Sequence, residues 1–101
     1  MTSGFVGIVC LDVHLPGSAT LKDRRSALAH LRRGLVERFG AAVAEVGDLD
    51  TPWQGRLTAA IVRQTQGDCE ERLRALEAWT ADQPDEVAVR QVRIVTPEDL
   101  A

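Results

Sequence analysis

The amino-acid sequence predicts an α+β domain of four strands and two helices in the order β-α-β-β-α-β. Apolar residues occupy alternate positions from 5 to 15, which is the period of a strand with one buried face. They recur every three or four residues from about 20 to 39 and from about 68 to 82, which is the period of an amphipathic helix. Residues 87–95 are rich in β-branched side chains, which favour a strand. No repeat or linker divides the chain, so residues 1–101 are expected to form a single domain.

The first strand and first helix have clear ends. The Pro16-Gly17-Ser18 turn stops the strand, Ser18 or Thr20 can cap the helix, and Gly40 closes it near Phe39. The odd positions of the strand form its apolar face: Phe5, Gly7, Val9, Leu11, Val13 and Leu15. The apolar stripe of the helix consists of Leu21, Leu28, Leu31, Leu35 and Phe39. We expect this stripe to pack on the sheet.

The remaining elements complete a two-layer arrangement. Residues 41–46 and 56–63 are predicted as strands, joined by a long loop over 47–55. Asp68, followed by Glu71, predicts a helix start, and one helix face holds Cys69, Leu73, Leu76 and Thr80. The order β-α-β-β-α-β is that of a ferredoxin-like βαββαβ sandwich, in which both helices cover one face of a four-stranded antiparallel sheet.

The uncovered face of this sheet is unusually apolar. A sheet with helices on one side normally carries polar residues on the other. Here the first strand places Val6, Ile8 and Cys10 on that side, and the third strand places Ala60 and Val62 there. We therefore expect a homo-oligomer, most simply a dimer, that buries this face.

Composition excludes several classes of protein. The longest apolar run, residues 5–11, is much shorter than a membrane span, which needs about 20 residues. Two cysteines without CxxC spacing do not form a disulfide framework, which favours the reducing cytoplasm. A net charge of −3 argues against binding DNA through overall charge, so we expect no DNA partner and no membrane partner.

The first helix nevertheless concentrates positive charge. Residues 20–39 contain six cationic and two acidic residues. The candidate anion- or RNA-binding residues are Lys22, Arg24, Arg25, Arg32 and Arg33. At 100° per residue, Lys22, Arg25, Arg32 and Arg33 form a row on one flank of the apolar stripe. Lys22, Arg24 and Arg25 lie beside the helix N-terminus and the Pro-Gly-Ser loop, which predicts a phosphate-sized pocket. Two alternatives remain: these cations pair with Asp23 or Glu45, or the basic helix associates with the acidic segment 68–86 of another copy.

Other chemistry has weaker support. Trp53, Gln54 and Glu45 are expected to contact a partner, although Trp53 could equally pack as a lid on the end of the sheet. Asp12 with His14, and Asp48 with Asp50, each lack a third ligand, so no metal site and no cofactor are expected. Cys10 is expected in a strand and Cys69 on an apolar helix face, where buried cysteines behave as small hydrophobic residues, and we assign no catalytic residue.

Several motifs resemble a known family. The Leu15-Pro16-Gly17 turn, the run from Leu21 to Arg25 with Leu28, the Arg38-Phe39 helix end, the Val43-Ala44-Glu45-Val46 segment and the Trp53-Gln54 pair follow the pattern of the YlxP-like family of small bacterial proteins of unknown function. That resemblance implies a ferredoxin-like fold, a cytosolic protein, and genes near those for translation initiation factor two and ribosome-binding factor A. It implies no catalytic residue.

The leading hypothesis is a non-enzymatic binding protein whose first helix contacts RNA or the ribosome. The alternatives are a protein or enzyme that binds a small anionic molecule at the N-terminus of that helix, and a structural domain that only self-associates.

Overall fold

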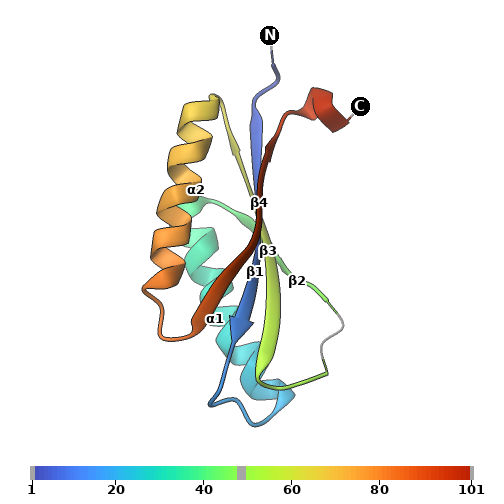
Figure 1. The fold of residues 1–101 in the computed structure, drawn as a ribbon, viewed down its shortest axis with the longest axis vertical. Helices are drawn as coiled ribbons and strands as arrows, with labels where there is room; N and C mark the ends of the chain where they lie inside the picture. Colours follow the sequence, from blue (N-terminus) through green and yellow to red (C-terminus); the bar gives the residue numbers. More distant parts are fainter. Residues whose placement is uncertain (1, 48–49, 101) are drawn as a thin grey trace.

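The chain forms one four-stranded antiparallel sheet with two helices packed on one of its faces (Figure 1). A computed structural model describes residues 2–47 and 50–100, so Asp48 and Leu49 of the expected loop lie outside the described residues. The elements are β1 (Phe5–His14), α1 (Leu21–Phe39), β2 (Ala42–Glu45), β3 (Gln54–Arg63), α2 (Gln66–Ala81), β4 (Glu86–Val95) and a 3₁₀ turn, η1 (Pro97–Leu100). The strand order is β2-β3-β1-β4, and all neighbours are antiparallel. The predicted ferredoxin-like arrangement is confirmed.

The core lies between the odd side of β1 and the two helices. Val9, Leu11 and Val13 of β1 are at most 2% exposed, and Leu15 just after the strand is also buried. Helix α2 approaches β1 so closely at Gly7 that a Cβ atom there would lie 2.9 Å from the Sγ atom of Cys69. The alternation read from the sequence therefore identifies the buried face of β1 correctly.

Helix α1 begins and ends as predicted, but one residue of its stripe does not reach the core. Thr20 is the N-cap, and Gly40 ends the helix in the left-handed region with φ of 62°. Leu28, Leu31 and Leu35 are buried, whereas Leu21 is 44% exposed. The prediction for Leu21 is wrong because side chains in a helix lean toward its N-terminus, so the first residue leans beyond the end of the helix.

The start of α2 also differs from the prediction. The N-cap is Thr65, whose Oγ1 atom accepts a hydrogen bond from the backbone N–H of Asp68 at 3.2 Å. The Asp68 carboxylate accepts a 2.6 Å hydrogen bond from Nε of Arg63 at the end of β3. That ion pair, together with the cap at Thr65, starts the helix two residues earlier than expected.

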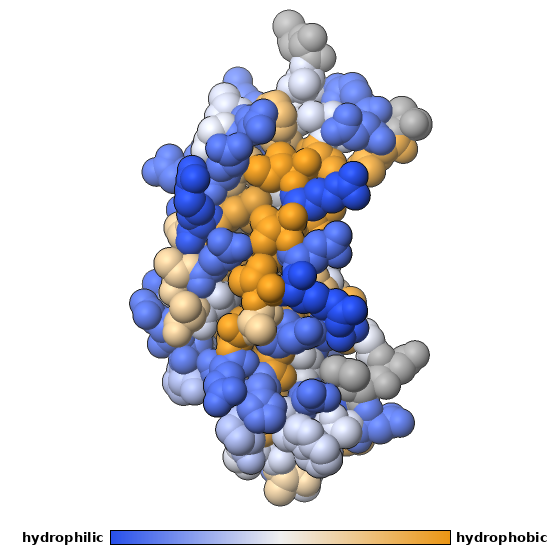
Figure 2. All heavy atoms as spheres, in the orientation of Figure 1, coloured by the Kyte–Doolittle hydropathy of each residue, from blue (hydrophilic) through white to orange (hydrophobic). Residues whose placement is uncertain are grey.

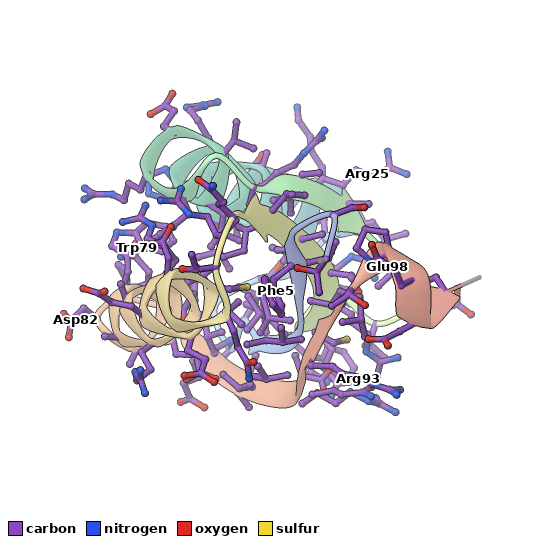
Figure 3. The ribbon with its side chains drawn as sticks, turned by 90° about the horizontal axis from the view of Figure 1, so that it is seen from above. Phe5, Arg25, Trp79, Asp82, Arg93 and Glu98 are labelled. Atoms are coloured by element: carbon purple, nitrogen blue, oxygen red, sulfur yellow. The ribbon has the colours of Figure 1, made fainter. Side chains whose placement is uncertain are left out.

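The two helices meet through a cluster of aromatic rings and arginines. Trp79 of α2 lies between the helices (Figure 3) and contacts Phe39 edge-to-face with ring centroids 6.1 Å apart. The guanidinium of Arg38 lies 5.5 Å from the Trp79 ring centroid, and that of Arg72 lies 5.1 Å from the Phe39 centroid. Arg72 also donates a hydrogen bond to the Arg38 carbonyl oxygen at 2.9 Å. These contacts join α1 to α2 above the sheet.

Strand β4 is exposed along most of its length. Residues 88–93 are all exposed, and an apolar band runs beside α2 over this strand (Figure 2). Register against β1 shifts between Cys10 and Leu11, which pair with Gln91 and Val89, so Arg90 is an extra residue in a β-bulge. At its end, η1 returns toward the start of the chain, where the Glu98 carboxylate accepts hydrogen bonds from the backbone and side chain of Ser3.

No helix in the described part of the chain has both the length and the apolar character needed to span a membrane.

Candidate functional site

The N-terminus of α1 already holds a carboxylate of its own chain. The Asp23 Oδ2 atom accepts hydrogen bonds from the backbone N–H groups of Ala19 and Thr20 at 3.1 and 3.2 Å. In return, the Asp23 N–H donates to Thr20 Oγ1 at 3.0 Å, which completes a capping box. A negative charge at this position also offsets the cations that the sequence places against the helix dipole. The expected phosphate-sized pocket thus contains the Asp23 carboxylate.

Arg24 points toward the sheet and is held there. Its Nη1 atom donates to the Thr51 carbonyl oxygen at 3.2 Å, and its Nη2 atom lies 3.5 Å from Glu45 Oε1. The Arg24 side chain is 12% exposed and that of Glu45 40%. The pairing with Glu45 that the sequence left open is the arrangement found. Arg24 therefore joins α1 to β2 and to the segment that precedes β3.

The other four cations share one exposed side of α1, which we call the basic flank: Lys22, Arg25, Arg32 and Arg33. Within residues 2–47 and 50–100, none of the four makes an ion pair with a carboxylate. Figure 3 shows Arg25 pointing away from the body of the protein. Lys22 and Arg33 are eleven positions apart, so the basic flank extends about 16 Å along the helix.

A shallow hollow of about 340 Å³ lies at the far end of the basic flank. It is lined by Ala29, Arg32, Arg33, Val36 and Glu37. The exposed Val36 gives this hollow an apolar floor beside two guanidinium groups. An elongated anionic partner that lies along α1 can occupy it, whereas it encloses little of a small molecule.

Trp53 and Gln54 lie near the beginning of α1, at one end of the sheet. The Trp53 carbonyl oxygen accepts a 2.7 Å hydrogen bond from the N–H of Leu15, just before the turn that leads to α1. The Trp53 side chain is 47% exposed, and Gln54 is exposed as well. Together with the Arg24–Thr51 contact, this bond brings the segment 51–54 next to the N-terminal end of the basic flank.

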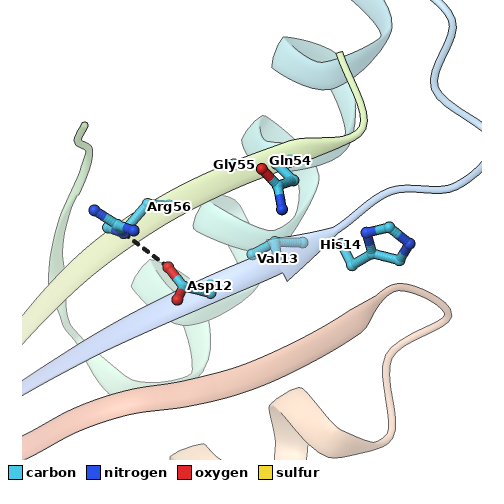
Figure 4. A pocket seen from close by; sticks show the side chains of 6 residues that line it. All are labelled: Asp12, Val13, His14, Gln54, Gly55 and Arg56. Carbon is cyan, nitrogen blue, oxygen red and sulfur yellow. Dashed lines mark hydrogen bonds and ion pairs between the residues drawn. The ribbon is translucent and has the colours of Figure 1, made fainter. Parts of the chain in front are cut away.

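The open face of the sheet carries an ion network that the sequence analysis missed. Arg56 Nε donates to Asp12 Oδ1 at 2.7 Å, and Arg90 Nη1 lies 3.8 Å from Asp12 Oδ2. The hydrogen bond to Asp12 raises the pKa of Arg56 above its ordinary value. A small pocket of about 120 Å³ beside this pair includes His14, which points away from Asp12 (Figure 4). The missed signal is the register, because Asp12 and Arg56 are directly opposite in the β1–β3 ladder.

A family model described as "Protein of unknown function (DUF503)" matches residues 6–94. The chain belongs to the DUF503 family. The matched range runs from β1 into β4 and includes every candidate site residue. A search of curated proteins found no match. Among solved structures, the de novo designed protein Ferredog-Diesel is similar, with 13% sequence identity, coverage of 90% of this chain and 89% of that chain, and a TM-score of 0.43.

In the described part of this DUF503 chain, no group of three or more His, Cys, Asp or Glu side chains is placed to hold a metal ion. Asp12 accepts a hydrogen bond from Arg56 and forms an ion pair with Arg90. Asp48, which the sequence analysis considered together with Asp50, lies outside the described residues.

Cys69 of the DUF503 domain is expected to resist alkylation while the protein is folded. Its side chain is fully buried, and burial, followed by the nearby Asp68 carboxylate, raises the pKa of its thiol. Only the thiolate attacks an alkylating reagent, so both effects slow the reaction. Iodoacetamide treatment at mildly alkaline pH, followed by peptide mass spectrometry, should modify Cys69 only after denaturant is added. Rapid modification of Cys69 without denaturant contradicts this prediction and reopens its assignment as a structural residue.

Proposed function

We propose that this DUF503 protein is a non-enzymatic RNA-binding domain whose basic flank contacts the phosphate backbone of structured RNA. The observation that carries the proposal is the exposure of Lys22, Arg25, Arg32 and Arg33 on one side of α1 without ion pairs in the described residues. Four such cations in a row of about 16 Å can each contact a phosphate of one nucleic-acid backbone, which carries a negative charge on every nucleotide. Phosphate contacts of this kind position a protein on its partner without reading bases.

The geometry favours a backbone over a small anion. A discrete phosphate at the N-terminus of α1 would compete with the Asp23 carboxylate for the N–H groups of Ala19 and Thr20 and with the Thr20 hydroxyl for that of Asp23. It would also need Arg24, which is held by Thr51 and Glu45. The basic flank, by contrast, requires no rearrangement of the chain to accept an extended polyanion.

The arrangement of aromatic residues supports backbone recognition rather than base stacking on the sheet. Phe5 is the aromatic residue of the four strands, and it packs on the helix side against the core. Domains that stack bases on a four-stranded sheet need aromatics on its open face. Trp53, beside the start of the basic flank, remains the residue placed to stack on an unpaired base.

The ribosome is the first RNA assembly to test. The likeness to YlxP-like proteins, with genes near those of translation and ribosome-assembly factors, supports this choice and a cytoplasmic location. Glu45 holds Arg24 in place, so we assign partner contact to Trp53 and Gln54.

The double variant Arg25→Glu/Arg33→Glu is expected to abolish co-sedimentation with ribosomes and binding to ribosomal RNA fragments. Neutralising about four phosphates gives a slope near −3.6 for log K against log salt, so wild-type affinity should fall roughly 100-fold between about 50 and 200 mM salt. Fluorescence anisotropy at several salt concentrations measures both the affinity for RNA and its dependence on salt.

Two control variants separate charge from folding. Arg25→Lys/Arg33→Lys keeps the charge and should retain binding, because a lysine ammonium also contacts phosphate. Arg74→Glu reverses an exposed cation on α2 and should leave binding unchanged. Unchanged binding by the double Glu variant, or equal loss with Arg74→Glu, rejects the basic flank as the RNA site. A thermal shift produced by one phosphorylated metabolite alone would favour the small-anion alternative.

A further inference from the structure

Strand β4 presents a long open edge. It contains ten residues, Glu86–Val95, and has a hydrogen-bonded neighbour on one side only, β1. The other edge strand, β2, has just four residues. Long open edges attract further strands, and natural proteins usually shorten them or protect them with charged residues, proline or a bulge. β2 is shortened in this way, whereas β4 keeps ten residues without lysine or proline and has two arginines and the bulge at Arg90.

The helix side of β4 is apolar and incompletely covered. Its side chains belong to Val87, Val89, Val92 and Ile94, which pair with the buried or helix-facing positions 13, 11, 9 and 7 of β1. Helix α2 leaves Val89 41% and Val92 42% exposed. Figure 2 shows the resulting apolar band beside α2. Apolar side chains therefore lie along the same edge as the open backbone groups.

The bulge at Arg90 changes the alternation of faces along β4. Gln91 pairs with Cys10 of the open face, and the extra residue Arg90 reaches Asp12 on that same face at 3.8 Å. Arg90 and Gln91 thus both point to the open face. As a result, helix-facing and open-face residues follow one another in the same order from Arg90 back to Glu86 as from Gln91 forward to Val95.

We propose that β4 pairs with β4 of a second copy, antiparallel and about a twofold axis between Arg90 and Gln91, to form a dimer with a continuous eight-stranded sheet. Opposite residues in an antiparallel pair must share a face. In this register Val89 is opposite Val92 of the second copy, and Val87 is opposite its Ile94. On the open face, Ala88 is opposite Arg93 and Arg90 is opposite Gln91.

Other registers do not satisfy this condition. A shift of one residue opposes side chains of different faces along much of the strand. A shift of two residues places Val89 opposite Arg90, or Gln91 opposite Val92, which point to different faces. The symmetry of the pattern also favours a second copy of the chain over an unrelated strand, because two identical β4 strands place residues of the same face opposite one another along their whole length. Assembly ends at two copies, since the short β2 edge offers no equivalent pairing.

This interface differs from the open sheet face that the sequence analysis expected a dimer to bury. On that face Val62 is 70% exposed, but Arg56, Asp12 and Arg90 form their ion network beside Cys10 and Ile8. Burying the network against another apolar sheet would remove three charged groups from water at a cost. Pairing at the β4 edge leaves the network in contact with solvent.

Matched lysine substitutions distinguish the two interfaces. Val92→Lys places a charge on the β4 edge, and Val62→Lys places one on the open sheet face; both valines are exposed enough to accept lysine without unfolding. Light scattering and sedimentation equilibrium should show a wild-type dimer at micromolar concentration. Val92→Lys should weaken it by about 100-fold, because each dimer loses two buried valine contacts, whereas Val62→Lys should leave it intact. A wild-type monomer at high micromolar concentration, or a dimer lost only with Val62→Lys, overturns the proposal.

A cross-link tests the register without weakening the interface. In a Cys10→Ser background, the double variant Val89→Cys/Val92→Cys should form a covalent dimer on mild oxidation, since opposite Cα atoms in an antiparallel pair lie within disulfide range. The single variant Val89→Cys should not, because its thiol faces Val92 of the second copy. Equal cross-linking by both variants contradicts the register. In this register the charged residues Glu86, Arg90 and Arg93 are each opposite an uncharged residue of the second copy. The dissociation constant of the dimer should therefore not rise steeply with salt as that of RNA binding does, which separates the failure of one proposal from that of the other.

Discussion

Leu35→Ala is expected to lower the free energy of unfolding by about 3 to 4 kcal/mol. Leu35 is fully buried in the stripe through which α1 packs on β3 and β2. Removing Cγ and its two methyl groups there loses their transfer free energy and leaves a cavity that the surrounding structure closes only in part. For a domain of this size, the melting temperature should fall by roughly 15 °C.

The control for Leu35→Ala is a substitution at the next residue of α1. Val36 is 44% exposed, so Val36→Ala removes little buried surface and should change the free energy of unfolding by no more than about 0.5 kcal/mol. Urea denaturation followed by circular dichroism measures both variants. Equal effects of the two substitutions would mean that α1 does not pack on the sheet through Leu35.

Gly34→Ala is expected to destabilise the protein by about 2 kcal/mol, although alanine is the better helix former. A Cβ atom at Gly34 would lie 2.2 Å from Cη2 and 2.4 Å from Cζ2 of Trp79. The rigid indole must then move, which disturbs its edge contact with Phe39 and its contact with the Arg38 guanidinium. The steric cost exceeds the gain of about 1 kcal/mol from helix propensity.

Gly67→Ala in α2 is the control for Gly34→Ala and is expected not to destabilise the protein. Gly67 lies in the first turn of α2, and a Cβ atom there would have no neighbour within 4 Å. The substitution should therefore leave stability unchanged or raise it slightly. Tryptophan fluorescence should shift with Gly34→Ala and not with Gly67→Ala, which links the loss of stability to the displaced ring. A gain in stability at both positions contradicts the close packing of Trp79 on α1.

The features that could be predicted from the sequence are those set by local pattern. The two faces of β1, the caps of α1 and the order of elements each depend on residues within a few positions of one another. The start of α2 could not be read in this way, because Asp68 also satisfies the pattern of a capping residue. Its carboxylate is directed instead to Arg63, which belongs to the preceding strand.

The candidate site likewise combines residues that the local pattern predicts with residues whose contacts are distant in the sequence. Lys22, Arg25, Arg32 and Arg33 could be grouped from helical spacing alone, and the structure places all four on the exposed side of α1. Helical spacing places Arg24 outside this group, on the side of Leu28 and Leu31, but it does not reveal that the side chain is directed to Glu45 and Thr51, which are distant in the sequence. The bulge at Arg90 likewise depends on the pairing of β4 with β1. Such contacts are specified by tertiary packing, which the period of a single segment does not reveal.

The juxtaposition of a basic helix and an acidic helix in one layer has a consequence for the kinetics of association. Helix α1 and its cap carry a net charge of +4, while residues 68–86 contain seven acidic residues against Arg72 and Arg74. The protein therefore has a transverse electric dipole as well as a net negative charge. Within the Debye length of about 8 Å, a polyanion attracts the α1 side and repels the α2 side. For the proposed RNA contact, this charge asymmetry favours encounters in which α1 faces the polyanion over those in which α2 does.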